Sequence, residues 1–424
     1  MKTSELKKLI KEGALDKRAD LYPDTQYAAE RYLAAIESFE RRFGTEREVM
    51  VLSVPGRSEL LGNHTDHNRG KVIAGAINRD IIAIASPSGT SKITVSSAGF
   101  PTDVVSLKDI AHPDRFRYFT SAALIAGVAQ GITERGYTVG GFDAYTISDV
   151  PKGSGISSSA AYEVMLGTVI NHLFCEGKID NTEIAKVAQY AENVYFGKPS
   201  GLMDQMACAV GGFVYIDFGA QDSPVVKPVA FSLADHGYEL CIVNTGGSHA
   251  DLNDDYASIP REMREVAALL GREVLADTDE GELYLESKRI RAALGDRALL
   301  RAFHFVRENL RVERGFEALA AGDIHAFLKT VTESGNSSFK YLQNVYSNNN
   351  VREQGLSLAL AVTEVLHSEA IGATRVHGGG FAGTIQTYVH TDYARAYVGY
   401  MENVFGEGCV MRLTVRGVGA CRVF

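Results

Sequence analysis

The sequence predicts a protein of two domains in which strands and helices are mixed. The 424 residues are enough for two or three domains of usual size, each with a buried core. Apolar runs of strand length alternate with longer segments of helical periodicity along the chain. A polar connection that contains proline, residues 219–228, is the candidate boundary between a first domain, residues 1–228, and a second domain, residues 229–424.

Composition and charge exclude several classes of protein. The chain is 45% hydrophobic and 22% charged, and its net charge is −9. Because the sequence has no run of five or more lysines and arginines, we expect no nucleic-acid partner. No apolar stretch reaches the roughly 18 residues of a membrane span, and the N-terminus has no apolar signal-peptide region. The five scattered cysteines lack CxxC spacing, which favours a reducing cytoplasm over a disulfide framework.

The first third of the chain predicts a helical arm followed by strands. Residues 1–45 show helical spacing of aromatic and apolar side chains, and Gly44 ends the run. Residues 50–54 predict a strand that leads into a polar loop, residues 55–70. Further strands are expected at 81–85 and 92–96, and a helix at 115–131 with Tyr118 on its apolar face.

Two more helices are predicted in the first domain, and two charged residues stand out, one within the second helix and one after it. Residues 160–174 form the first and residues 182–196 the second, with Thr182 as its N-cap. Glu192 falls on the border of the second helix's apolar stripe, where a solvated rim position is the default interpretation. Asp204 lies in an otherwise uncharged segment, which is costly unless the carboxylate has a partner or a function.

The second domain is predicted to open with a strand at 239–243 and to be mainly helical over 255–371. A glycine-rich turn follows at residues 378–383, and a strand is expected at 384–389. Such a turn indicates positive φ angles or a close backbone approach.

The stretch Pro151 to Val164, PKGSGISSSAAYEV, joins a predicted strand to a predicted helix. Its glycines allow a tight turn, and its serines stand where the helix begins, so backbone N–H groups and hydroxyls can hold an anion, most often phosphate. The stretch matches neither the Walker A pattern nor GxGxxG. It could therefore also be an ordinary helix-capping turn that binds nothing.

The loop at residues 55–70 has two functional interpretations. His64, Asp66 and His67 could ligate a metal, because His-x-x-His with a nearby carboxylate is a plausible spacing. They could instead hydrogen-bond a polar small molecule, and a merely solvated loop is the third interpretation.

Three stretches in this order resemble the motifs of the GHMP small-molecule kinases: PGRSELLGNHTDH at 55–67, PKGSGISSSAAYEV at 151–164 and GGGFAG at 378–383. The first is similar to the galactokinase signature, and GLMDQ at 201–205 resembles the segment that carries the catalytic aspartate of galactokinases. The resemblance covers residues 48–395 and implies an α+β fold of two domains, ribosomal-S5-domain-2-like and then ferredoxin-like, with the active site in the cleft between them.

The resemblance also implies an ATP-dependent and Mg²⁺-dependent enzyme that phosphorylates the anomeric hydroxyl of a hexose, with galactose as the favoured substrate. By motif position, it implies the following roles: catalysis by Asp204 and Arg57; sugar binding by Asn63, His64, Asp66, Gly201 and Tyr256; nucleotide binding by Lys152, Gly153, Ser154, Gly155, Ile156, Ser157, Ser158 and Ser159; and Mg²⁺ binding by Ser159 and Glu192. Hydroxyl and carboxylate oxygens are ligands that suit Mg²⁺. We expect a cytoplasmic monomer or weak homodimer.

Two residues depart from the galactokinase signature. Asn63 stands where galactokinases carry glutamate, and His67 where they carry tyrosine. A neutral amide that donates as well as accepts could admit galacturonate, L-arabinose or N-acetylgalactosamine in place of galactose. The motifs also leave open a GHMP kinase for an isoprenoid or amino-acid alcohol, a non-catalytic sugar sensor and a metallohydrolase.

Overall fold

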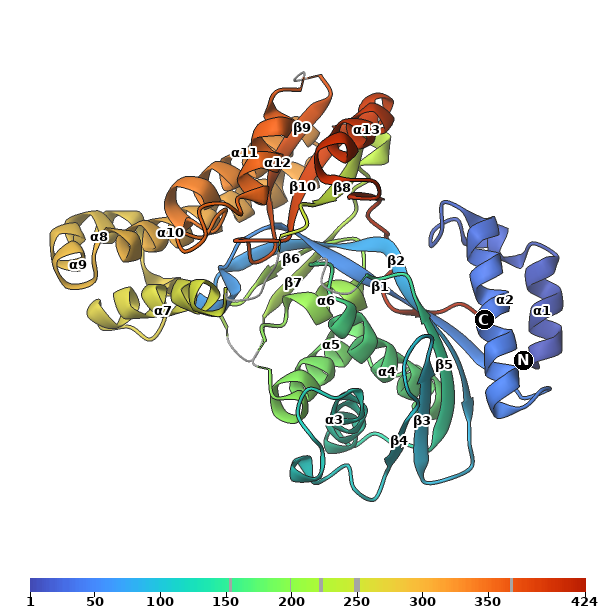
Figure 1. The fold of residues 1–424 in the computed structure, drawn as a ribbon. Coiled ribbons are helices and arrows are strands. Elements are labelled where there is room, and N and C mark those ends of the chain that lie inside the picture. The colour runs from blue at the N-terminus through green and yellow to red at the C-terminus, as the bar shows by residue number, and fades with distance from the viewer. Residues whose placement is uncertain (152–154, 199, 221–223, 248–251, 367–368) are drawn as a thin grey trace.

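The computed structural model describes residues 1–151, 155–198, 200–220, 224–247, 252–366 and 369–424 (Figure 1). In this part of the chain the strands form two separate sheets. The larger sheet has eight strands among the described residues: β1 (Met50–Leu61), β2 (Lys71–Pro87), β3 (Lys92–Ser97), β4 (Asp103–Ser106), β5 (Phe142–Ser148), β6 (Phe213–Asp217), β7 (Val225–Val229) and β12 (Cys421–Arg422).

The long antiparallel pair β1 and β2 is the backbone of this sheet. Both strands are buried on both faces over most of their length, which explains the apolar residues at the start of β1 and along most of β2. The register shifts between Pro55 and Arg57 and again between Glu59 and Leu61. Such bulges redirect side chains, and here they lie where β1 carries the polar residues of the first motif.

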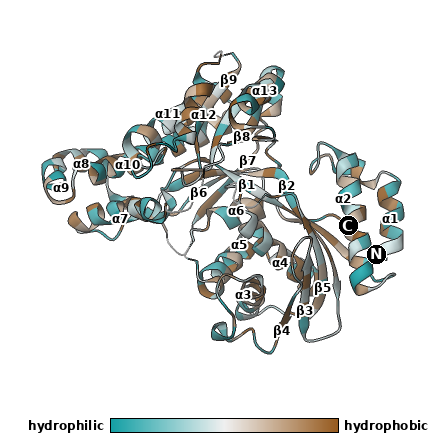
Figure 2. Cartoon of the chain, viewed as in Figure 1, coloured by the Kyte–Doolittle hydropathy of each residue, from teal (hydrophilic) through white to brown (hydrophobic). Residues whose placement is uncertain are grey.

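Helices cover both faces of the larger sheet (Figures 1 and 2). On one face lie α3 (Ser121–Glu134), α4 (Ser158–Phe174), α5 (Asn181–Tyr190) and α6 (Met203–Val210), which share one large apolar core with the sheet. The arm lies on the other face, as α1 (Thr3–Lys11) and α2 (Thr25–Phe43). The alternation of strand side chains separates the two cores, since Leu52 belongs to the first and Val51 to the second.

The smaller sheet has the order β11-β8-β10-β9, with all pairs antiparallel. Its strands are β8 (Tyr238–Asn244), β9 (Ile371–His377), β10 (Thr384–His390) and β11 (Val410–Leu413). The helices that accompany it are α7 (Asn253–Leu269), α8 (Glu280–Leu285), α9 (Ser287–Leu294), α10 (Asp296–Ala320), α11 (Ile324–Ser337), α12 (Gly355–Glu364) and α13 (Ala394–Phe405).

Short helical segments connect these elements. Within the described ranges, six of them are 3-10 turns: Ala14–Arg18, Asp66–Asn68, Pro113–Arg115, Ala234–His236, Leu275–Asp277 and Thr391–Tyr393. Two are π-helical extensions, Ala191–Phe196 after α5 and Ser338–Leu342 after α11. π-helical turns are frequent at functional sites, and the first of these contains Glu192.

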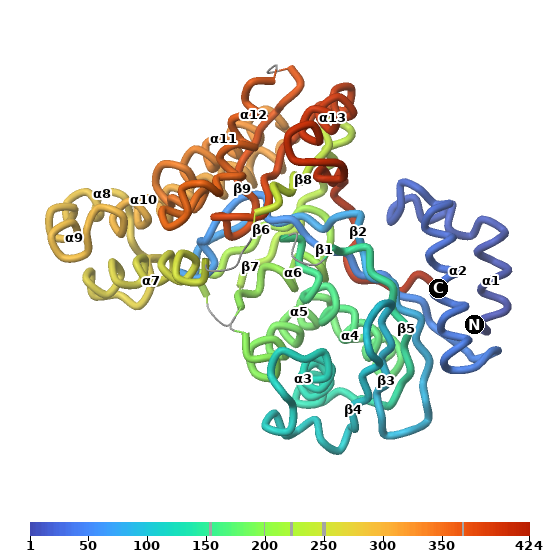
Figure 3. The backbone as a smooth tube through the Cα atoms, in the orientation of Figure 1, coloured from blue at the N-terminus to red at the C-terminus, as the bar shows by residue number. Residues whose placement is uncertain are grey.

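The end of the chain returns to the larger sheet, where β12 pairs with β1 and the C-terminus lies beside α2 (Figure 3). A buried charge network joins the arm to this last segment. Asp80, which has no exposed surface, accepts a hydrogen bond from Arg31 of α2 at 2.8 Å and lies 3.4 Å from the guanidinium of Arg416. The hydroxyls of Tyr22 and Ser53 also donate to this carboxylate. The arm is thus held to the sheet by charge as well as by apolar packing.

The α+β architecture and most predicted elements are confirmed, including the helical arm that Gly44 ends. Three local predictions are wrong. The first strand continues to Leu61, so residues 55–61 are bulged strand and not loop. Helix α3 begins at Ser121, and Tyr118, expected on its apolar face, precedes it and is 57% exposed. Asp180 and not Thr182 caps α5, because its carboxylate accepts from two backbone N–H groups.

Among the described residues, no helix is both long enough and apolar enough to cross a membrane. The predicted domain bounds at residues 228 and 229 fall at the end of β7, a strand of the larger sheet that the polar connection did not suggest.

Candidate active site

The structure brings Asp204 and Arg57 together, although 147 residues separate them. Arg57 projects from the bulged part of β1, and Asp204 lies in the first turn of α6. The guanidinium donates to Asp204 Oδ1 through Nε at 2.7 Å and approaches it through Nη2 at 2.6 Å. Its third nitrogen, Nη1, donates to the backbone carbonyl of Gly155. The ion pair is therefore tied directly to the stretch that resembles a phosphate loop.

The surroundings of Asp204 keep its carboxylate ionised. Burial raises the pKa of Asp204, but the charge of Arg57 and the hydroxyl of Ser157 lower it by more, so the pKa lies below its ordinary value. Burial likewise lowers the pKa of Arg57, and the charge of Asp204 reverses that effect. An ionised carboxylate beside a fixed cation can accept a hydrogen bond or a proton from a hydroxyl group.

The structure describes Pro151 and residues 155–159 of the phosphate loop, residues 151–159, so the predicted contacts of Lys152, Gly153 and Ser154 lie outside the described residues. Gly155 has a φ of +74°, and a Cβ there would lie 3.2 Å from the ring of His377. The buried Ile156 accepts a hydrogen bond from the backbone of Arg57 through its carbonyl group. The loop is thus hydrogen-bonded to β1 and lies close to His377 at the end of β9.

Ser157 takes the left-handed conformation, with a φ of +57°, immediately before α4 begins at Ser158. In this conformation its hydroxyl donates to Asp204 Oδ2. Ser158 and Ser159 are half-buried in the first turn of the helix, where free N–H groups and the helix dipole favour an anion. The helix N-terminus and the Arg57–Asp204 pair are therefore neighbours.

A second group of carboxylates lies beside the pair. Glu192 is buried, and its Oε1 accepts from Lys198 at 2.8 Å, whereas its Oε2 accepts from Ser200 at 2.7 Å and Gln205 at 2.8 Å. Gln205 also donates to Glu163 Oε2 at 3.1 Å. The sequence placed Glu192 at a rim by default, and the π-helical turn instead points it into the protein.

The side chains of Glu192 and Glu163 fit the binding of a Mg²⁺ ion. Glu163 is fully buried, and its Oε1 has no hydrogen-bond partner within the described part of the chain. Burial and the charge of Glu192 raise the pKa of Glu163 well above its ordinary range. An unpartnered carboxylate oxygen next to a second carboxylate suits a hard cation, and Mg²⁺ needs only one or two protein ligands because it keeps waters and phosphate oxygens.

The loop that follows β1, residues 62–70, approaches the same site. Asp66 is close to the segment before α6, since a Cβ on Gly201 would lie 2.6 Å from Asp66 Oδ2. The ring of His64 makes a hydrogen bond of 2.9 Å to the carbonyl oxygen of Gly379, and burial lowers the pKa of His64 to about 4. The loop therefore bridges the catalytic segment and the glycine-rich turn, and it will be called the bridging loop.

No group of three or more His, Cys, Asp or Glu side chains is arranged to hold a metal ion within the described ranges. This finding, together with the hydrogen bond that His64 already makes, speaks against a metal centre of His64, Asp66 and His67.

Tyr256 reaches the glycine-rich turn from α7. Its hydroxyl donates to the carbonyl of Gly380 at 2.8 Å, and its ring meets Phe381 edge to face at 5.4 Å. Tyr256 and His64 thus hold adjacent carbonyls of one turn, although α7 and the bridging loop are far apart in the sequence.

Asn63 is fully buried, and its amide is engaged by the protein. Its Nδ2 donates to the carbonyl of Gly378 at 2.7 Å and to Glu59 Oε1 at 3.2 Å. Its Oδ1 accepts from Asn344 at 2.8 Å and from Ser338 at 3.2 Å. A direct contact with a sugar, which the sequence predicts for this residue, would require these bonds to open, and it stays a prediction.

Sequence reasoning missed four contacts that shape the site: the hydroxyl of Ser157 on Asp204, the buried Glu163, the ammonium of Lys198 on Glu192, and His377 beside the phosphate loop. Glu163 left a signal, because it is a charged residue within the apolar run of α4. The other three depend on backbone turns that single-sequence periodicity does not show.

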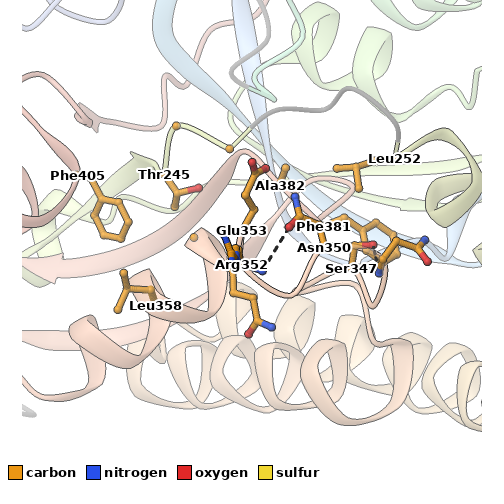
Figure 4. A pocket seen from close by; sticks show the side chains of 15 residues that line it. Thr245, Leu252, Ser347, Asn350, Arg352, Glu353, Leu358, Phe381, Ala382 and Phe405 are labelled. Atoms are coloured by element: carbon orange, nitrogen blue, oxygen red, sulfur yellow. Dashed lines mark hydrogen bonds between the residues drawn. The ribbon is translucent and has the colours of Figure 1, made fainter.

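A cavity of about 870 Å³ lies behind the glycine-rich turn (Figure 4). Phe381 and Ala382 border it on one side, and Thr245, Arg352 and Phe405 are among the residues on the others. Among the described residues, none of those predicted for catalysis or for binding lines it.

Comparisons with known proteins agree with the geometry. Residues 121–212 match the family model described as the GHMP kinases N terminal domain, and residues 37–87 match the galactokinase galactose-binding signature. A galactokinase of Streptomyces coelicolor is 33% identical over 393 residues, covering 92% of this chain and 94% of that protein. Human galactokinase is 29% identical over 401 residues, covering 92% of this chain and 96% of that protein.

Solved structures share the fold. A Lactococcus lactis galactokinase complexed with galactose superposes with a TM-score of 0.78 at 24% identity, covering 92% of this chain and all of the other. A mevalonate kinase superposes with a TM-score of 0.60 at 14% identity, covering 86% of this chain and 98% of the other. The first relative, with its near-complete coverage, decides the family: this chain belongs to the galactokinase family of GHMP kinases.

Proposed function

We propose that this protein transfers the γ-phosphoryl group of ATP to the anomeric hydroxyl of galactose. The observation that carries the proposal is the Arg57–Asp204 ion pair, which is bonded to the phosphate loop through Gly155 and Ser157. Relatives that match almost the whole chain are galactokinases, and a solved relative holds galactose. A carboxylate for the sugar hydroxyl and an anion site for the phosphates are the two parts that this reaction needs.

In this proposal Asp204 accepts the proton of the anomeric hydroxyl. The hydroxyl oxygen forms a bond to the γ-phosphorus, the bond from that phosphorus to the bridging oxygen breaks, and ADP leaves with the electron pair. Arg57 keeps Asp204 ionised and offers positive charge to the phosphoryl group in transfer. The proton then passes from Asp204 to solvent.

The phosphate loop and the start of α4 bind the triphosphate in this proposal, through backbone N–H groups and the serine hydroxyls. Ser159 and Glu192 would hold the Mg²⁺, with Glu163 adding negative charge beside them. When bound, Mg²⁺ neutralises phosphate charge and aligns the γ-phosphoryl group.

We propose Asp66, His64 and Tyr256 as the residues that shape the sugar site, with Gly201 leaving room beside Asp66. Asp66 is the strongest candidate for a direct contact, because its side chain stands next to the catalytic segment and is 16% exposed. His64 and Tyr256 act by holding the glycine-rich turn. Because Asn63 is engaged by protein groups, its neutral amide gives no reason to prefer galacturonate over galactose.

The proposal includes a cytoplasmic protein that acts as a monomer or weak homodimer. All five cysteines are free thiols in the structure, which supports a reducing compartment.

The test is ADP formation against galactose, N-acetylgalactosamine, L-arabinose, galacturonate and glucose. We expect turnover with galactose and none with glucose. Turnover with no sugar would overturn the proposal, and turnover with galacturonate alone would show that the substrate assignment is wrong. The Asp204→Asn variant should bind nucleotide normally and lose turnover.

A further inference from the structure

Lys198 holds a position that the reaction described above does not use. It follows the π-helical turn and Gly197, whose φ of +80° lets the chain reverse direction. The backbone N–H of Lys198 returns to the carbonyl of Glu192 at 3.1 Å, and its ammonium donates to Glu192 Oε1 at 2.8 Å. Backbone and side chain of Lys198 thus both bind the residue expected to hold Mg²⁺.

The charges around this contact are unbalanced. The carboxylates of Glu192, Glu163 and Asp204 all act on the Lys198 ammonium. Glu192 and Glu163 share the amide of Gln205, which donates to one oxygen of each. Two neighbouring buried carboxylates repel each other unless one of them is protonated or a cation neutralises them. In the nucleotide-free protein, Lys198 provides positive charge at this place.

The ammonium is also free to leave. The Lys198 side chain is 54% exposed, whereas that of Glu192 is 3% exposed. Lysine is a compact charge on a flexible four-carbon stem, and an ion pair with one exposed partner is weak. The fixed carboxylate can therefore exchange one cation for another without a change in the fold.

We propose that Lys198 is the resident counter-ion of Glu192 and that Mg²⁺ displaces its ammonium when nucleotide binds. The inference rests on the proposed function, since it takes Glu192 as a Mg²⁺ ligand.

The test compares ADP affinity with and without Mg²⁺ by calorimetry, in the wild type and in Lys198→Met. Without Mg²⁺, the variant leaves Glu192 uncovered near the ADP phosphates, so we expect binding about three- to tenfold weaker than in the wild type. With saturating Mg²⁺ the cation covers Glu192 in both proteins, and the two affinities should agree within about twofold. The gain in affinity from Mg²⁺ is therefore larger in the variant.

Two further variants serve as controls. Lys198→Arg keeps the charge and should retain a Mg²⁺ gain close to that of the wild type. Lys178→Met removes a lysine that is 69% exposed and pairs with Glu176, and it should leave both affinities unchanged. Equal melting temperatures of all four proteins will show that the fold is kept.

The inference is overturned if Lys198→Met weakens ADP binding by the same factor with and without Mg²⁺, or leaves both affinities unchanged. It is also overturned if Lys178→Met has the same effect as Lys198→Met. A wild type that binds ADP equally well with and without Mg²⁺ would overturn the Mg²⁺ role of Glu192, and this inference with it. A wild type with a clear Mg²⁺ gain and an unaffected variant would overturn the role of Lys198 alone.

Discussion

The Asn63→Asp substitution is expected to destabilise the protein, because the geometry around Asn63 distinguishes a nitrogen from an oxygen. The replacement keeps the size of the side chain and exchanges the Nδ2 group for an oxygen. That nitrogen donates to the carbonyl of Gly378 at 2.7 Å and to the Glu59 carboxylate at 3.2 Å. After the substitution, three acceptors face one another at a side chain that has no exposed surface.

The size of the effect follows from these two bonds. A buried acceptor that loses its donor costs about 1–3 kcal/mol, and a buried charge without a partner costs about 3–5 kcal/mol. We expect a loss of about 3–5 kcal/mol in the free energy of unfolding, against the roughly 5–15 kcal/mol that holds a typical domain. Burial already raises the pKa of Glu59, so a second carboxyl beside it is disfavoured in its charged form.

Urea unfolding at several pH values measures this loss. The introduced carboxyl should have a raised pKa in the folded protein, so its neutral form, which can donate again, is the form the fold tolerates. The loss in free energy of unfolding relative to the wild type should therefore be smallest at acid pH and should grow as pH rises.

The matched control is Asn403→Asp, an exposed position in α13 where the change should stay within about 0.5 kcal/mol. An Asn63→Asp variant with wild-type stability and an altered KM for galactose would refute the reasoning. It would show that Asn63 faces the sugar, as the signature suggested.

Three further substitutions have defined outcomes. Asp204→Asn should lower kcat roughly 100- to 10,000-fold while ADP affinity measured by calorimetry stays unchanged, and a kcat within tenfold of wild type would contradict its role as base. Arg57→Gln should raise the pKa of Asp204, because the positive charge that lowers this pKa is lost. The acid limb of the profile of kcat/KM against pH should therefore move to higher pH. If the limb does not move, Arg57 does not control the ionisation of Asp204. Asp80→Asn leaves Arg31 and Arg416 facing a neutral group and should lower the free energy of unfolding, measured with urea, by about 3–5 kcal/mol. The control Asp20→Asn, in an exposed ion pair, should lower it by less than about 1 kcal/mol. Since folding lowers the pKa of Asp80, the stability that its carboxylate contributes is present above the unfolded pKa of about 3.9 and is lost as pH falls through the pKa of the folded protein. If Asp80→Asn remained less stable than the wild type in strong acid, the stabilising role of the Asp80 charge would be contradicted.

The sequence predicted those parts of the site that are carried by local motifs. The pairing of Arg57 with Asp204 followed from motif resemblance, and the helix that begins behind the phosphate loop followed from its Gly and Ser residues. Helices with a clear apolar stripe, such as α5, were also predictable, because one side of each packs on the sheet.

Other features depend on contacts between distant segments. β1 was expected to end before Pro55, but a bulge lets the strand continue through the polar motif. Asn63 was expected to bind the sugar because of its position in the galactokinase signature, and the sequence did not show its hydrogen-bond partners Gly378 and Asn344, which lie about three hundred residues away. Glu192 looked like a rim charge on an ideal helix, and the π-helical turn changes its direction. Periodicity carries no information about such partners.

Phosphorus NMR of a reaction with galactose and ATP is the decisive measurement for the proposed transfer. We predict one new sugar phosphate for each ADP formed, with the phosphorus coupled to the anomeric proton, and no new signal with Asp204→Asn. Phosphate on another hydroxyl would contradict the proposed position of the anomeric oxygen at Asp204. ATP breakdown to inorganic phosphate without a sugar product would contradict the kinase assignment itself.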